Sequence, residues 1–382
     1  MLKKANLFAV LFYALLGACF MLQAYDDSFR HLKYGLPAVL LFFYITTTSL
    51  KKQIVIHDFL SHQFKMYALM IGLSIIVLFF SGFTARFFEE VYFIISPLIT
   101  LFLVLQITDR EALRKHLDII FYLLIAANLI YTGLQFFDFF QSKTSLTEEL
   151  VSSTAATESP FAFDFGLFTV YYFLDGKKKN TILAFLFAFV AFKRIVLLGL
   201  LVAYGCYFFY KKIRSKAPAR SFLTIVTIAN IVLVVNIYLF SSGKYDKIVE
   251  KLLNVSANYI SQGRYVLYQG IFDLVQNNTF FHGLGLGTIT HYLVSEEAFL
   301  SNLHSDLLKV FLEFGIFLYI FWVYNFYKKT YNRIFLLVVS VFMNILFITD
   351  NVFVYYDVML FYYLFIVLLF ENKLTQPTQN GK

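Results

Sequence analysis

Residues 263–315 read GRYVLYQGIFDLVQNNTFFHGLGLGTITHYLVSEEAFLSNLHSDLLKVFLEFG, and we expect the rest of the chain to be organised around them. The stretch contains Arg264, a glycine-rich run at 283–287 and three of the seven histidines of the chain, His304 among them. Long apolar runs lie on both sides of it. A polar stretch of this length between apolar runs predicts a functional loop rather than a simple connector.

The composition predicts an all-α, polytopic integral membrane protein. Hydrophobic residues make up 59% of the 382 residues, and the mean hydropathy is +0.70. This is too much apolar surface for a soluble domain of this length. The net charge of +8 does not indicate nucleic-acid binding, because the basic residues gather beside the apolar runs, as in cytoplasmic loops. Cys19 and Cys206 lie inside apolar runs, so we expect neither a disulfide nor a metal site, and no cofactor.

Twelve runs are apolar and long enough to be counted as membrane helices in a single membrane domain of residues 1–382. Most of the 32 lysines and arginines fall on one side of this arrangement, which places both termini in the cytoplasm. The predicted helices are 5–24, 36–50, 66–83, 91–108, 117–137, 161–174, 181–192, 195–210, 222–240, 306–326, 334–349 and 358–370.

The run from 181 to 210 predicts a short helical hairpin. It is longer than one crossing needs, both its flanks are basic, and Lys193 and Arg194 interrupt it, so these two residues are expected at an extracytoplasmic tip. A single tilted helix with snorkelling charges is the alternative. The same topology gives two external segments, a loop at 138–160 that is rich in Ser and Thr and a large catalytic loop at 241–305.

Within the large loop, Arg264 begins a helical pattern in which Leu267 and Ile271 share the apolar face and Tyr268 lies away from it. This predicts an amphipathic helix at the membrane surface, where Arg264 can bind a lipid phosphate bidentately. A surface arginine that touches headgroups without a function is the alternative. The run GLGLG predicts a tight turn that folds the loop back on itself.

His304 lies in the sequence SNLHSD directly before an apolar helix, among residues that can cap it. A histidine in the first helical turn feels the positive end of the helix dipole, which favours a neutral base near pH 7. Five and nine residues on, Lys309 and Glu313 have the spacing of an intrahelical ion pair.

These features together resemble the O-antigen ligase and polymerase superfamily. The resemblance lies in Arg264 followed four residues later by Tyr268, then Gly-Leu-Gly, then His304-Ser305, nine residues and Gly315. A short hairpin with Arg194 at its external tip is a further shared feature. The similarity covers about 181–326. Tyr268 stands where many members have Trp, and Lys193 stands where small or hydroxyl residues are common.

The resemblance implies an inverting, metal-independent glycosyltransferase that takes a glycan from undecaprenyl pyrophosphate to a sugar hydroxyl. His304 would be the base, and Arg264 and Arg194 would stabilise the departing pyrophosphate. Lys193, Tyr268 and Asn302 would complete the substrate contacts. The implied location is a bacterial inner membrane with a periplasmic site. The implied partners are the lipid-linked donor and acceptor, the bilayer, a chain-length regulator and a flippase, with no nucleic acid.

Three functions remain open from the sequence. A polymerase adds the growing glycan to a new lipid-linked repeat unit, whereas a ligase moves finished polymer to a lipid A core, and both use the same donor chemistry. A flippase or other transporter also has about twelve helices. It is expected to show related halves and ionisable residues deep in several helices.

Overall fold

The computed structural model describes residues 2–47, 56–142, 159–191, 193–213, 219–241, 243–253, 264–274, 279–295 and 303–371, and every element in them is a helix. The N-terminal elements are α1 (Leu2–Tyr25), the 3-10 helix η1 (Asp27–Gly35), α2 (Leu36–Thr47), α3 (Asp58–Ser81), α4 (Ala85–Ile107), α5 (Arg110–Ser142) and α7 (Ala162–Asp175). The hairpin and loop helices are α8 (Lys178–Val190), α9 (Arg194–Ile213), α10 (Ala219–Ser241), α11 (Asp246–Leu253), α13 (Arg264–Leu274), α14 (Thr279–His282) and α15 (Thr288–Ser295). The last are α16 (Asp306–Lys328), α17 (Ile334–Thr349), the 3-10 helix η2 (Val352–Val354) and α18 (Tyr356–Glu371).

The predicted fold class is confirmed, since each of the twelve predicted membrane helices is matched by a helix. Seven described helices are long and apolar enough to cross a membrane, and α17 and α18 are shorter apolar helices. The break in the 181–210 run is real. α8 ends at Val190 and α9 begins at Arg194, so the single tilted helix is excluded.

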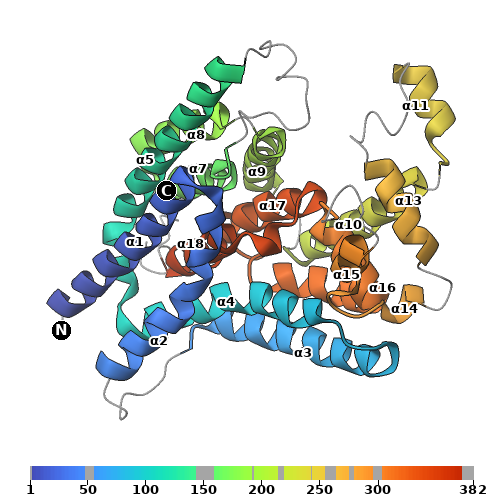
Figure 1. The fold of residues 1–382 in the computed structure, drawn as a ribbon, viewed down its shortest axis with the longest axis horizontal. Helices are drawn as coiled ribbons and strands as arrows, with labels where there is room; N and C mark the ends of the chain where they lie inside the picture. The colour runs from blue at the N-terminus through green and yellow to red at the C-terminus, as the bar shows by residue number, and fades with distance from the viewer. Residues whose placement is uncertain are drawn as a thin grey trace.

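Three short apolar helices, α7, α17 and α18, are largely buried inside the bundle. In Figure 1, α17 and α18 occupy the middle of the ribbon, α1 and α5 lie together on one side, and α3 and α4 lie together on another. Nearly all side chains of α7 and of α18 up to Leu369 are buried. A helix surrounded by protein does not have to match the thickness of the hydrocarbon layer, which explains how such short helices are accommodated.

Three helices of the large loop, α13, α14 and α15, pack against α10 or α16. α13 lies against α10, where the rings of Phe272 and Tyr238 are 4.9 Å apart. α14 and α15 lie against α16, the helix that follows His304. Of the predicted external loop at 138–160, residues 143–158 lie outside the described residues.

Candidate functional site

His304 stands one residue before the cap of α16. Ser305 is the N-cap, and its hydroxyl accepts a hydrogen bond from the backbone N–H of Leu308 at 3.3 Å. His304 is half-buried, and its φ of 53° makes it the one non-glycine residue with positive φ among those described. The left-handed region is uncommon for residues other than glycine, and strained residues of this kind cluster at functional sites. His304 therefore lies just outside the first helical turn in which the sequence placed it.

α16 is kinked at Gly315, whose φ of 74° and ψ of 172° are not helical. A kink frees backbone carbonyls of the preceding turn from their intrahelical partners. Two of these carbonyls are bonded by the glycine-rich turn, since Leu284 donates its N–H to Leu312 at 3.0 Å and Gly285 donates to Glu313 at 2.8 Å. The turn thus supplies the hydrogen bonds that the kink removes.

This joint between the glycine-rich turn and α16 requires glycine on both sides. A Cβ atom on Gly283 would lie 2.4 Å from the carbonyl oxygen of Glu313. A Cβ atom on Gly315 would lie 2.3 Å from the carbonyl oxygen of Phe281. Both contacts are with backbone, which cannot move aside as a flexible side chain can. The Gly-Leu-Gly and His-x10-Gly motifs are therefore two halves of one contact.

Glu313 holds α15 in place. Its Oε1 accepts hydrogen bonds from the backbone N–H groups of Gly287 at 2.9 Å and Ile289 at 3.2 Å, at the N-terminus of α15. A carboxylate is favourable there because it satisfies free N–H groups and complements the helix dipole. The predicted intrahelical pair of Glu313 with Lys309 is wrong, because each side chain is used to hold a different element.

Lys309 forms a buried ion pair with Glu90 of α4. Oε1 of the same carboxylate accepts a hydrogen bond from the hydroxyl of Thr290 in α15, at 2.8 Å. The two charged side chains are only 8% and 4% exposed. This cluster ties three helices together, and its burial means that each charge depends on the other.

The two basic residues at the hairpin tip, Lys193 and Arg194, have different surroundings. The Nζ atom of Lys193 lies 2.8 Å from Oδ2 of Asp350 and 4.1 Å from the centre of the Phe163 ring. Arg194, the first residue of α9, is exposed, and no acidic side chain in the described part of the chain pairs with it. Of the two basic residues, Arg194 therefore has the charge that is open to an anionic ligand.

Asp350 connects the hairpin tip to the turn that contains His304. Its backbone carbonyl accepts a hydrogen bond from the N–H of Asp306 at 3.2 Å. Its Oδ1 accepts from the hydroxyl of Tyr355 at 3.1 Å. Burial and the nearby Asp350 carboxylate raise the pKa of Tyr355 well above its usual value, so the hydroxyl stays a donor.

A cavity of about 460 Å³ opens beside these contacts. Its walls come from predicted external segments and from the predicted external ends of membrane helices: the end of α1, η1, the start of α4, α5 near Tyr131, residues 159–163, the hairpin tip, α15 and the 354–357 segment. The lining residues are Gln23, Asp27, Arg30, His31, Lys33, Tyr34, Arg86, Glu89, Glu90, Phe93, Tyr131, Ser159, Pro160, Phe163, Lys193, Thr290, Val294, Val354, Tyr355 and Asp357.

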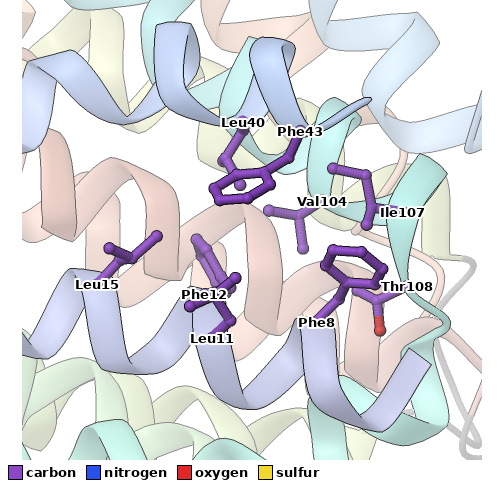
Figure 2. A pocket seen from close by; sticks show the side chains of 9 residues that line it. All are labelled: Phe8, Leu11, Phe12, Leu15, Leu40, Phe43, Val104, Ile107 and Thr108. Carbon is purple, nitrogen blue, oxygen red and sulfur yellow. The ribbon is translucent and has the colours of Figure 1, made fainter. Parts of the chain in front are cut away.

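A second space, between α1, α2 and α4, has a different character. Figure 2 shows that its side chains are apolar apart from Thr108, and its volume is about 10 Å³. That is room for about one water molecule, so we interpret it as a packing gap rather than a substrate site.

The remaining predicted site residues are only partly placed. Arg264 is the first residue of α13, as the pattern predicted, and its side chain lies outside the description. Asn302 also lies outside the described residues. Tyr268, predicted on the polar face of α13, is buried beside Ile271, so that face assignment is wrong. A tyrosine has a large apolar ring, and this favours burial when a neighbouring helix is present.

Sequence reasoning missed the acidic partners Asp350 and Asp357. Each lies close to one end of a short apolar helix, and Oδ2 of Asp357 lies 2.7 Å from Nζ of Lys33. A carboxylate beside a buried helix was the available signal, because such a group needs a partner. The partner itself comes from a distant part of the chain.

Comparison with known proteins gives one family match. Residues 180–323 match a family model described as O-Antigen ligase. This match supports the O-antigen ligase and polymerase superfamily. It contains the hairpin, the large loop and the joint between the glycine-rich turn and α16. No curated protein matches the chain, and neither does any solved structure.

Proposed function

We propose that this protein is a membrane-embedded glycosyltransferase of the O-antigen polymerase type. It moves the growing glycan from undecaprenyl pyrophosphate to a hydroxyl of the next lipid-linked repeat unit. Its location is a bacterial inner membrane, with the site facing the periplasm and both termini in the cytoplasm. A chain-length regulator and a flippase are its expected partners.

In the proposed reaction the acceptor hydroxyl attacks the anomeric carbon of the donor from the side opposite the pyrophosphate. The carbon–oxygen bond to the pyrophosphate breaks, the leaving group takes the bonding electrons, and the configuration inverts. His304 accepts the hydroxyl proton. Arg264 and Arg194 stabilise the charge on the pyrophosphate.

The observation that carries the proposal is the meeting of the two motif-bearing segments at Asp350. Its side chain holds Lys193 at the hairpin tip, and its backbone holds Asp306 beside His304. The segments join next to a cavity large enough for a small ligand. The family match over 180–323 supports the same chemistry.

The ligase reading uses the same residues, and we prefer the polymerase because such proteins are more numerous and diverse. The transporter reading explains the loop helices less well. A transporter does not need α14 and α15 docked on α16 by a glycine contact on each side.

The experiment compares surface glycan in cells with and without this chain, separated by size, on the lipid A core and on the undecaprenyl carrier. Core carrying one repeat unit in its absence supports the polymerase. Full-length polymer stranded on the carrier makes the protein a ligase, and repeat units trapped on the cytoplasmic side make it a transporter.

Complementation with variants tests the residues. We expect His304→Ala to abolish transfer at normal membrane levels of the protein. Arg264→Ala and Arg194→Ala should lose most activity, and Lys at either position should restore only part of it, because bidentate binding of phosphate is lost. Full activity of His304→Ala would remove it as the base.

A further inference from the structure

Among the residues that the structure describes, every cation that lines the cavity is neutralised by a protein partner. Four of these described lining residues are cations, and each has a carboxylate within ion-pairing distance. The pair of Lys33 with Asp357, at 2.7 Å, is buried, and the pair of Lys193 with Asp350, at 2.8 Å, is partly buried. The other two, closer to solvent, are Arg30 with Asp27 at 3.3 Å and Arg86 with Glu89.

The lining carboxylates balance the lining cations. Asp27, Glu89, Glu90 and Asp357 are the four acids, and Glu90 is paired with Lys309 behind the wall. An anionic ligand would have to compete with the paired carboxylate at each cation, and separating the buried pair of Lys33 with Asp357 is costly. It would also face the four acids, with no unpaired cation among the described lining residues to compensate. The cavity therefore disfavours a charged ligand of either sign.

The uncharged part of the lining fits a sugar. Gln23, Ser159 and Thr290 already donate hydrogen bonds within the protein, and each keeps an amide hydrogen or a hydroxyl lone pair for a ligand. A paired carboxylate likewise still has lone pairs for hydroxyl donors. The lining also contains the aromatic rings of Tyr34, Phe93, Tyr131, Phe163 and Tyr355, with Lys193 over the ring of Phe163. Aromatic rings suit the apolar C–H face of a pyranose. The volume of about 460 Å³ is in the usual range of small-ligand sites.

We propose that this cavity binds a neutral sugar of the lipid-linked glycan, one without carboxylate, sulfate or phosphate. This inference rests on the proposed function and names the substrate class of its site. Arg194 is not among the described residues that line the cavity, so the pyrophosphate that it is proposed to bind lies elsewhere. Within the proposed site, the neutral sugar and the anionic linkage occupy separate places.

The test measures binding to the purified full chain in lipid nanodiscs free of glycoside detergents, by saturation-transfer NMR. The probes are three neutral methyl glycosides, methyl glucoside, methyl galactoside and methyl N-acetylglucosaminide, each raised to concentrations above a Kd of about 1 mM. The matched acidic probes are methyl glucuronide and methyl galacturonide. We expect binding of at least one neutral glycoside and weaker binding of its uronate. No neutral binding, or a uronate bound as well as its neutral partner, overturns the proposal.

Two variants locate the binding. Glu89→Gln leaves Arg86 without its carboxylate and should strengthen uronate binding about tenfold, the value of one added charge-assisted hydrogen bond. Glu111→Gln, an exposed residue at the start of α5 and outside the cavity lining, is the control and should change nothing. An unchanged uronate affinity in Glu89→Gln contradicts the charge balance.

Val294→Trp fills the cavity from a position that is 42% exposed, and it should abolish binding of the neutral glycoside. Val232→Trp, on the exposed face of α10, is the control. Binding retained in Val294→Trp places the sugar elsewhere and overturns the proposal. These experiments measure binding and not glycan transfer. A negative binding result therefore does not count against the proposed polymerase function, and a negative result in the cellular test does not change the measured affinities.

Discussion

Replacing Gly315 with alanine should separate the glycine-rich turn from α16. The backbone there has φ 74° and ψ 172°, a region essentially restricted to glycine, so an alanine costs about 1–3 kcal/mol in strain. Its Cβ would also stand 2.3 Å from the carbonyl oxygen of Phe281 and 2.7 Å from the nitrogen of Gly283. If the turn moves away to relieve this contact, the hydrogen bonds of Leu284 and Gly285 are lost as well.

Each of those two hydrogen bonds contributes about 1 kcal/mol, which brings the total to roughly 3–5 kcal/mol. A penalty of about 3 kcal/mol shifts the balance between docked and undocked turn by about a hundredfold. The expected result is faster hydrogen exchange in peptides covering 279–295 of the protein in nanodiscs, together with loss of the glycan ladder in cells.

Gly205→Ala is the matched control. Gly205 lies inside α9 with nothing near its missing Cβ, and alanine is the better helix former by about 1 kcal/mol. We expect unchanged exchange at 279–295 and normal glycan. If Gly315→Ala instead behaves like this control, the glycine-rich turn does not depend on Gly315 for its contact with α16.

Three further predictions concern a buried ion pair, the pH dependence of stability and metal ions. Glu90→Gln should lower the free energy of unfolding by about 3–5 kcal/mol, because Lys309 keeps a buried, unpaired charge. The double variant Glu90→Gln, Lys309→Met should recover most of this loss, measured by thermal unfolding. Burial, followed by Arg110, lowers the pKa of His57 to about 4, and its Nδ1 accepts from the N–H of Phe59. Below about pH 6.5 the unfolded chain binds a proton at this histidine that the folded chain does not bind. The stability contributed by neutral His57 is therefore full above about pH 6.5 and is lost as the pH falls towards 4. The charge of Asp58 opposes this lowering of the pKa, and that of Arg333 adds to it. The apparent Tm of His57→Asn should fall less between pH 7 and 5, and an equal fall would refute the assignment. Chelators should leave transfer unaffected, and inhibition reversed by added metal would contradict the metal-free scheme.

The hairpin shows what could be predicted from the sequence. The run at 181–210 is longer than one crossing needs and has basic flanks, and those two facts favour a break near Lys193 on local grounds alone. The cap of α16 was predictable for the same reason, because Ser305 precedes an apolar helix and its effect is local.

The partners within the site were not predictable in this way. The spacing of Lys309 and Glu313 indicated a pair on one helix, but burial lets Glu90 from α4 and the N–H groups of α15 compete for them. The spacing rule holds for exposed helix surfaces, where no other partner is available. The glycine motifs were likewise visible separately, whereas their contact depends on the kink at Gly315.

The ion pairs of the structure also bear on the number of membrane crossings. Pairs such as Lys193 with Asp350 join segments predicted to be external. Arg114 with Asp175 and Lys329 with Asp58 join segments predicted to be internal.

One wrongly counted crossing would have reversed the side of every later segment, so pairs between early and late segments would have joined opposite faces. Lys33 with Asp357 and Lys329 with Asp58 both connect the first quarter of the chain to the last, one at each predicted face. The even count of crossings between them is therefore supported by contacts that the count did not use. The excess of basic residues beside α8, α9 and α16 indicates which of the two faces is cytoplasmic, and that orientation stays a prediction.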